Sequence, residues 1–203
     1  MTQLSRAKAE ASADADDAAV IQLSRHEPEY FTVLFRRHAP HIQRYVTRRL
    51  GQHAAEDVVA ETFLLAFRQR DSYDQARPDA RPWLYGIATN LVGRHRRDEV
   101  RLYRALARTG TDPVTEAFTD RVDDRVSAGT AGRRLAAGLA RLPEELRDTL
   151  LLVVWGDLSY EQAAAALGVP VGTVRSRVSR ARSKLRRALG GTNPAGYDEE
   201  PPS

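Results

Sequence analysis

One stretch of sequence decides the fold of the carboxy-terminal part of the chain, residues 158–177: LSYEQAAAALGVPVGTVRSR. Ser159 followed by Gln162 forms a capping-box pattern, which predicts the start of a short helix. Gly168 then ends that helix, and a second helix is predicted over residues 171–189. Two helices separated by a short turn that contains glycine are typical of the helix-turn-helix unit.

The second predicted helix has one apolar face and one basic face. At 100° per residue, the apolar side chains fall within an arc of about 100°; they are Val174, Val178, Ala181, Leu185, Ala188 and Leu189. The opposite face carries small hydroxyls, which allow close approach, and arginines, which reach guanine edges or phosphates. The alternative is a solvated basic helix that only covers the core. We expect base contacts from Arg175, Ser176, Ser179 and Arg180, and phosphate contacts from Arg177, Arg182 and Lys184.

The composition favours an all-α protein and excludes several classes of site. The chain has 203 residues, of which 42% are hydrophobic, and the formal net charge is +4. Alanine, leucine and arginine dominate, which favours helices over sheet. The chain has no cysteine, so disulfides, thiolate metal sites and cysteine nucleophiles are excluded.

The sequence predicts no enzyme, no cofactor and no metal site. The histidines are scattered along the chain, and neither a glycine-rich phosphate loop nor a nucleophile elbow is present. The amino terminus lacks the basic segment and apolar core of a signal peptide. The longest apolar run, residues 150–155, is far too short to cross a bilayer. We therefore expect a soluble cytoplasmic protein without membrane insertion.

The pattern along the chain predicts two small helical domains joined by a flexible linker. Turn-forming and small residues gather between two helical stretches, and the two ends lack apolar periodicity. The expected boundaries are a flexible tail over 1–26, a first domain over 27–106, a linker over 107–132, a second domain over 133–190 and a disordered acidic tail over 191–203.

In the first domain, the helix expected over residues 54–70 is apolar around most of its circumference. Its one polar stripe contains Asp57, Glu61 and Arg68, at positions i, i+4 and i+11. Such a stripe is either a plain solvated face or a docking surface for a charged partner.

The next predicted helix, which begins at Pro82 and continues through Arg97, interleaves aromatic and basic residues. Gly86, Asn90, Gly93 and Arg97 share one side of this helix, with Trp83 and Arg94 beside them. The glycines open space, the asparagine can hydrogen-bond a base edge, and the indole can stack on a base. These are the parts needed to hold an unpaired base against a charged backbone. The alternative is that Trp83 and Tyr85 belong to the core.

These motifs together resemble sigma factors of the extracytoplasmic-function group of the sigma-70 family. The resemblance rests on residues 55–63 (AEDVVAETF), 81–90 (RPWLYGIATN), 158–161 (LSYE), 169–177 (VPVGTVRSR) and 180–182 (RAR). It covers roughly residues 27 to 189. Each motif is moderately specific, but their order and spacing together are highly specific.

The resemblance implies a function as well as a fold. The first domain would be region 2 and the second region 4 of a factor that binds core RNA polymerase, directs it to promoters and promotes melting of the DNA. The stripe Asp57, Glu61 and Arg68 would dock on the clamp helices of the largest polymerase subunit, and the flap of the second-largest subunit is a further expected contact. An anti-sigma protein is the other expected partner.

The resemblance also divides the DNA contacts. The loop over residues 71–81, with Asn90, would capture a flipped base of the −10 element, while Trp83, Arg94 and Arg97 hold the melted strand. Region 4 would read the −35 element. Two departures concern Gly86, where many relatives have a basic residue, and Ser179, where some have an aromatic one. The competing hypothesis is a stand-alone helix-turn-helix regulator that binds duplex DNA.

Overall fold

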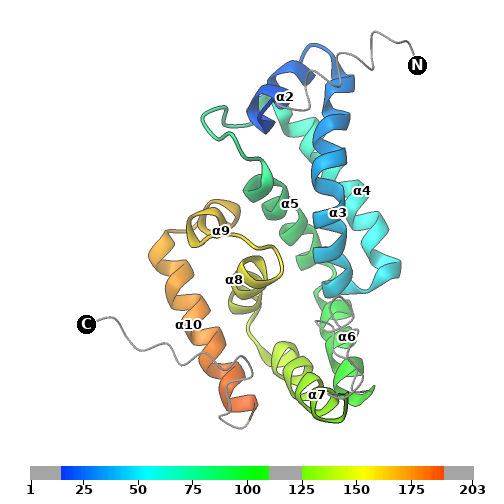
Figure 1. Ribbon diagram of the computed structural model, residues 1–203, viewed down its shortest axis with the longest axis vertical. Coiled ribbons are helices and arrows are strands. Elements are labelled where there is room, and N and C mark those ends of the chain that lie inside the picture. Colours follow the sequence, from blue (N-terminus) through cyan, green and yellow to red (C-terminus); the bar gives the residue numbers. More distant parts are fainter. Residues whose placement is uncertain (1–14, 110–124, 190–203) are drawn as a thin grey trace.

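The computed structural model describes residues 15–109 and 125–189, with side chains of the second range described from Gly132. Every regular element within these ranges is a helix, which confirms the expected all-α class (Figure 1). The amino-terminal module contains α2 (Asp17–Ser24), η1 (Pro28–Tyr30), α3 (Phe31–Leu50), α4 (Gln52–Gln69), η2 (Arg70–Ser72), α5 (Arg81–Arg94) and α6 (Arg96–Thr109). The carboxy-terminal module contains α7 (Arg125–Arg141), α8 (Glu144–Val154), α9 (Tyr160–Leu167) and α10 (Val171–Ala188).

The helix-turn-helix has the geometry that its sequence predicts. The Ser159 side chain accepts a hydrogen bond from the Gln162 amide, and the Gln162 side chain accepts one from the Ser159 amide. Gly168 ends α9 in the left-handed region at φ 64°, where a residue without a Cβ has no steric penalty. Helix α10 then begins at Val171 behind Pro170.

The helix that was expected to run from Pro82 through Arg97 ends at Arg94, and a new helix begins at Arg96. His95, between them, has φ −96° and ψ 20°, outside the helical region. The chain therefore changes direction directly after Arg94. One face of α6 is thereby turned into the core, where Glu99 and Tyr103 are buried.

The expected flexible tail over residues 1–26 differs from the structure at its carboxy-terminal end, where residues 17–24 form α2. Val20 and Ile21 are fully buried and anchor this short helix on the rest of the module. Two apolar residues in a polar, alanine-rich stretch are too few to give a periodic signal, so sequence pattern alone missed the helix.

Asp17, the first residue of α2, ties three separate segments together. Its carboxylate accepts hydrogen bonds from Arg37 at 2.9 Å and from the Ala80 amide at 2.9 Å, and lies 2.8 Å from the His38 ring. Burial alone would raise the pKa of this carboxyl, but the bonds to His38 and Ala80 and the adjacent positive charges lower it on balance. Asp17 thereby fixes the start of α5 relative to α2 and α3.

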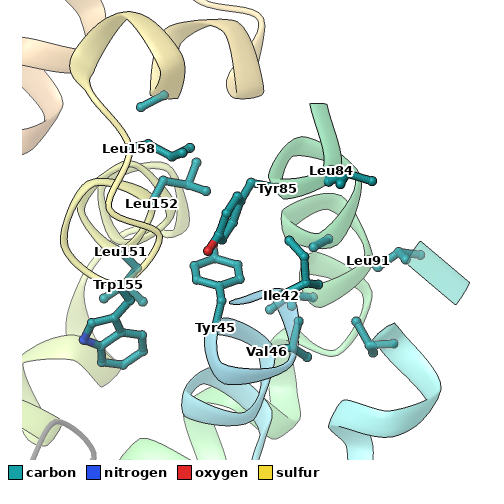
Figure 2. Packing of buried hydrophobic residues seen from close by; sticks show 14 of the residues in the cluster. Ile42, Tyr45, Val46, Leu84, Tyr85, Leu91, Leu151, Leu152, Trp155 and Leu158 are labelled. Atoms are coloured by element: carbon teal, nitrogen blue, oxygen red, sulfur yellow. The ribbon is translucent and has the colours of Figure 1, made fainter. Parts of the chain in front are cut away.

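The two modules are packed against each other, which the expectation of a flexible linker did not include. Helices α6 and α7 pair along their length, and α5 contacts α9. Apolar residues from both modules meet in one core, where Tyr85 and Tyr45 face Leu151, Leu152 and Trp155 (Figure 2). The folded chain is thus a single packed unit.

We predict that Asp17→Ala lowers the free energy of unfolding by about 1–3 kcal/mol, because it leaves buried donors without an acceptor. The pKa of Asp17 is depressed in the folded state, so its stabilisation is present above the ordinary carboxyl pKa and is lost as the pH falls through the folded-state pKa. Denaturant unfolding at neutral pH and near pH 3 measures both effects. The mutant should lose stability at neutral pH and differ less from the native chain in acid.

The matched control is Asp71→Ala, which removes a carboxylate from an exposed pair with Arg25. Exposed pairs contribute about 0–1 kcal/mol, so this variant should unfold almost like the native chain. Equal losses for both variants would show that Asp17 has no special anchoring role.

Candidate nucleic-acid and polymerase interface

Helix α10 separates its two faces as the wheel predicted. Val174, Val178, Ala181 and Leu185 are buried on α7, α8 and α9, whereas Ala188 is exposed near the end of the helix. The expected DNA-facing side chains are exposed, with the exception noted below; they are Arg175, Ser176, Ser179, Arg180, Arg182 and Lys184. The exposed face of α10 carries no acidic residue, so it presents a continuous basic surface to a polyanion.

Two of the α10 arginines already have partners. Arg180 donates to the carbonyl and hydroxyl oxygens of Ser176, one turn earlier. Arg177 is half-buried and pairs with Glu145 of α8 at 3.2 Å. Arg177 is therefore turned toward its own module, and a phosphate contact would require it to leave Glu145.

Helix α5 presents Asn90 to solvent, with the other expected strand contacts nearby. Trp83 is half-buried and lies against the ring of Tyr73 with centroids 4.9 Å apart. Arg97 is exposed at the start of α6. Arg94 pairs with Glu61 of α4 at 2.8 Å, so one expected DNA contact is joined to one expected polymerase contact. The alternative assignment of Tyr85 to the core is correct, since that ring is only 2% exposed.

The glycines of α5 serve a different purpose from the one expected. A Cβ at Gly86 would lie 2.5 Å from the carbonyl oxygen of Ala166 in α9, and one at Gly93 would lie 3.2 Å from the Glu144 carboxylate. The space that these glycines open is thus filled by the carboxy-terminal module. Residues beside Asn90 on the helix contact protein in this arrangement.

The stripe on α4 is exposed and includes an apolar residue that the sequence reading left out. Asp57 and Arg68 are exposed and Glu61 is half-buried. Leu64 lies between Glu61 and Arg68 on the same face and is 47% exposed. Phe35 of α3, 46% exposed, stacks edge-on with Phe63 nearby. Exposed apolar side chains within a charged stripe are typical of a docking surface rather than a solvated face.

A second feature missed by the sequence reading is an arginine stripe on α6. Four arginines fall within an arc of about 60° on one side of this helix and are exposed: Arg97, Arg101, Arg104 and Arg108. The buried side opposite holds Glu99 and Tyr103. A helical wheel over residues 96–109 would have revealed the stripe, but the sequence reading had ended this helix near Arg97.

Among the helices that the structure describes, none is long and apolar enough to cross a membrane. The described residues also contain no group of three or more potential metal ligands.

Comparison with known families agrees with this arrangement. Residues 34–107 match the family described as Sigma-70 region 2, and residues 132–185 match Sigma-70, region 4. The two matches fall on the amino-terminal and carboxy-terminal modules, respectively.

Curated relatives extend the similarity over most of the chain. The chain is 36% identical over 161 residues to the ECF RNA polymerase sigma factor SigE of Mycolicibacterium smegmatis, a match that covers 77% of this chain and 60% of the relative. It is 30% identical over 175 residues to SigW of Bacillus subtilis, which covers 83% of this chain and 93% of that relative. The chain thus spans about three fifths of SigE but nearly all of SigW.

Solved structures show the same fold. The structure of CnrH in complex with the cytosolic domain of CnrY matches 87% of this chain and 99% of that chain, with a TM-score of 0.59 and 27% identity. The sigma factor RpoE of Bartonella quintana, solved with the anti-sigma factor NepR, matches with a TM-score of 0.55 at 22% identity, which supports the fold alone. On the family matches and the curated relatives together, this chain belongs to the extracytoplasmic-function (ECF) sigma factors of RNA polymerase.

Proposed function

We propose that this chain binds core RNA polymerase, directs it to promoters through contacts to the −10 and −35 elements, and promotes melting of the DNA. The observation that carries this proposal is the coexistence of two different DNA-binding surfaces in one chain. Helix α10 offers a basic face of the kind that enters a major groove, and α5 offers an exposed amide beside an indole and arginines. A regulator that reads only duplex DNA does not need the second surface.

Residue roles follow from exposure. In region 4, Arg175, Ser176, Ser179 and Arg180 are placed for base contacts, and Arg182 and Lys184 for phosphates. In region 2, Asn90 with the loop over residues 71–81 would take an extruded −10 base, supported by Trp83, Arg94 and Arg97. The arginine stripe on α6 would continue the phosphate track, because it begins at Arg97 and extends away from α5 along the next helix.

The partners proposed are core polymerase, promoter DNA and an anti-sigma protein. The charged stripe on α4, completed by Leu64 and Phe35, would dock on the clamp helices of the largest subunit, and region 4 would contact the flap. An anti-sigma partner is supported by the RpoE structure, which contains one. We also propose a non-enzymatic, cytoplasmic role, since the factor would act on the polymerase and supply no chemistry of its own.

Promoter recognition requires the two modules to separate. The −10 and −35 elements lie roughly 25 base pairs apart by name, which is about 85 Å of duplex. Gly86 touches Ala166 in the packed chain, and nine residues from Ala166 to Arg175 can span at most about 32 Å. Asn90 is only one helical turn beyond Gly86. Both elements therefore cannot be read at once while α5 and α9 are in contact.

We expect promoter-specific transcription only when the chain and core polymerase are combined. Region 2 needs melted DNA, and the free chain holds its two readers too close together. Run-off transcription with core enzyme, alone and with the chain, on a promoter library followed by start-site mapping measures this. Tight, sequence-specific binding to duplex promoter DNA by the free chain, unaffected by core enzyme, would favour the stand-alone regulator instead.

The double substitution Asp57→Ala with Glu61→Ala should weaken core binding and leave helical content unchanged. An exposed stripe contributes little to folding, because exposed ion pairs are worth about 0–1 kcal/mol. Competition for core polymerase against a labelled copy of the native chain measures binding, and circular dichroism measures helicity. Glu56→Ala is the control, since Glu56 is an exposed acid next to the stripe but off its face. A double mutant that melts early and still binds core would make the stripe structural.

Arg175→Ala should relax sequence preference at the −35 element, at a cost of about 1–3 kcal/mol for the base pair concerned. Lys184→Ala should instead weaken binding evenly across sequences and reduce the salt slope by about one unit. Both residues are exposed on α10, so each serves as the control for the other. Holoenzyme binding to a set of −35 variants at several salt concentrations separates the two effects, and identical sequence-blind losses would mean that α10 only follows phosphates.

A further inference from the structure

A cluster of four buried charges joins the two modules. Arg49 of α3 pairs with Glu99 of α6 at 2.6 Å, which keeps these two helices of region 2 together. Across the module boundary, Arg49 also pairs with Asp148 of α8, and Arg147 of α8 pairs with Glu99 at 2.9 Å. The side chains of Arg49, Glu99 and Arg147 are each only 1% exposed. Two positive and two negative groups thus form a closed set that is complete only when the modules are docked.

The same docking covers the surface proposed to read the −10 element. Arg81, at the start of α5, donates to the Gly156 carbonyl at 2.8 Å. Gln162 of the helix-turn-helix donates to Asp79 at 2.9 Å, in the loop proposed to capture the flipped base. Ala166 fills the space above Gly86. Region 4 therefore contacts both the base-capture loop and the helix that carries Asn90.

The chemistry of this interface suits a contact that opens. Buried ion pairs gain little net stability, because the cost of removing the charges from water offsets most of their attraction. When the modules separate, all four groups return to water together and none is left buried without a partner. An interface made only of apolar side chains would lose hydrophobic stabilisation on opening with no such compensation.

From these contacts we propose that the docked arrangement is a self-inhibited resting state, held by the charge cluster as a latch and released when core polymerase engages the chain. This inference rests on the proposed sigma function and concerns the regulation of the same DNA-binding surface. The exposed stripe on α4 lies outside the interface, so core can dock there first while region 4 still covers α5. Separation is then the step that makes the DNA-binding surfaces available.

Two variants open the latch in different ways. Gly86→Ala places a Cβ 2.5 Å from a backbone carbonyl of α9, so region 4 must move. Asp148→Asn removes the charge whose only printed partner is Arg49, while Arg49 keeps Glu99. The matched control is Gly93→Ala, the same substitution two turns further along α5, where the Cβ meets only the tip of the flexible Glu144 side chain.

Separation can be measured directly, because the chain has no cysteine and two can be introduced for fluorophores. Exposed Gln52 in region 2 and Ser183 in region 4 are suitable positions. We expect high energy transfer in the free native chain and in Gly93→Ala, and low transfer in Gly86→Ala and Asp148→Asn. Adding core polymerase should bring the native chain to the low-transfer state. The open variants should bind core at least about tenfold more tightly, since they no longer have to leave a docked state.

The outcomes distinguish the latch from the proposed function. If both variants keep helical content and show the transfer and core affinity of the native chain, the latch is wrong while the sigma function stands. If Gly86→Ala loses helical content, Asp148→Asn decides by the same two readouts. If no form of the chain, open or closed, binds core or supports promoter-specific transcription, the proposed function itself fails.

Discussion

The pairing of Arg49 with both Glu99 and Asp148 is the interaction on which the arrangement of this chain depends. One guanidinium joins α3 to α6 within region 2 and to α8 of region 4. Its geometry is supported by Tyr45, whose hydroxyl accepts from Arg49 at 2.8 Å and also lies 2.9 Å from the Thr89 hydroxyl of α5. The position of α8 is thereby referred to three helices of region 2. Directional bonds of this kind fix a register, which apolar packing alone specifies less tightly.

Arg147 extends the same logic into region 4. Besides pairing with Glu99, it donates to the carbonyl oxygens of Leu139 and Leu142 where α7 ends. Carbonyls at a helix end lack partners within the helix, so a buried arginine satisfies them and fixes the α7–α8 turn. The residue therefore has a role inside region 4 that persists when the modules separate. This is the reason why Asp148, and not Arg147, is the informative position for testing the interface.

The sequence was sufficient for features that depend on local pattern and insufficient for those that depend on contacts between distant segments. The capping box at Ser159, the stop at Gly168 and the buried face of α10 are local, and all three are confirmed. The docking of the modules is not local, because Arg49 and Asp148 are 99 positions apart and neither belongs to a recognisable motif. Gly86 shows the limit most clearly: its departure from the usual basic residue was visible, but a reading of one helix attributes the free space to DNA. In the structure, another helix occupies it.

Gly86 also links specificity to regulation. A basic side chain at this position could reach a phosphate, but no residue larger than glycine fits against the Ala166 carbonyl. The chain thus has close docking of region 4 where a relative with a basic residue would have a charged contact to DNA. The arginine stripe on α6 lies on another face and is exposed in the docked chain, with Arg97, Arg104 and Arg108 pointing away from the buried Glu99. Phosphate affinity moved from α5 to α6 would remain compatible with a covered α5, because long-range attraction to DNA does not require the base-reading surface to be open.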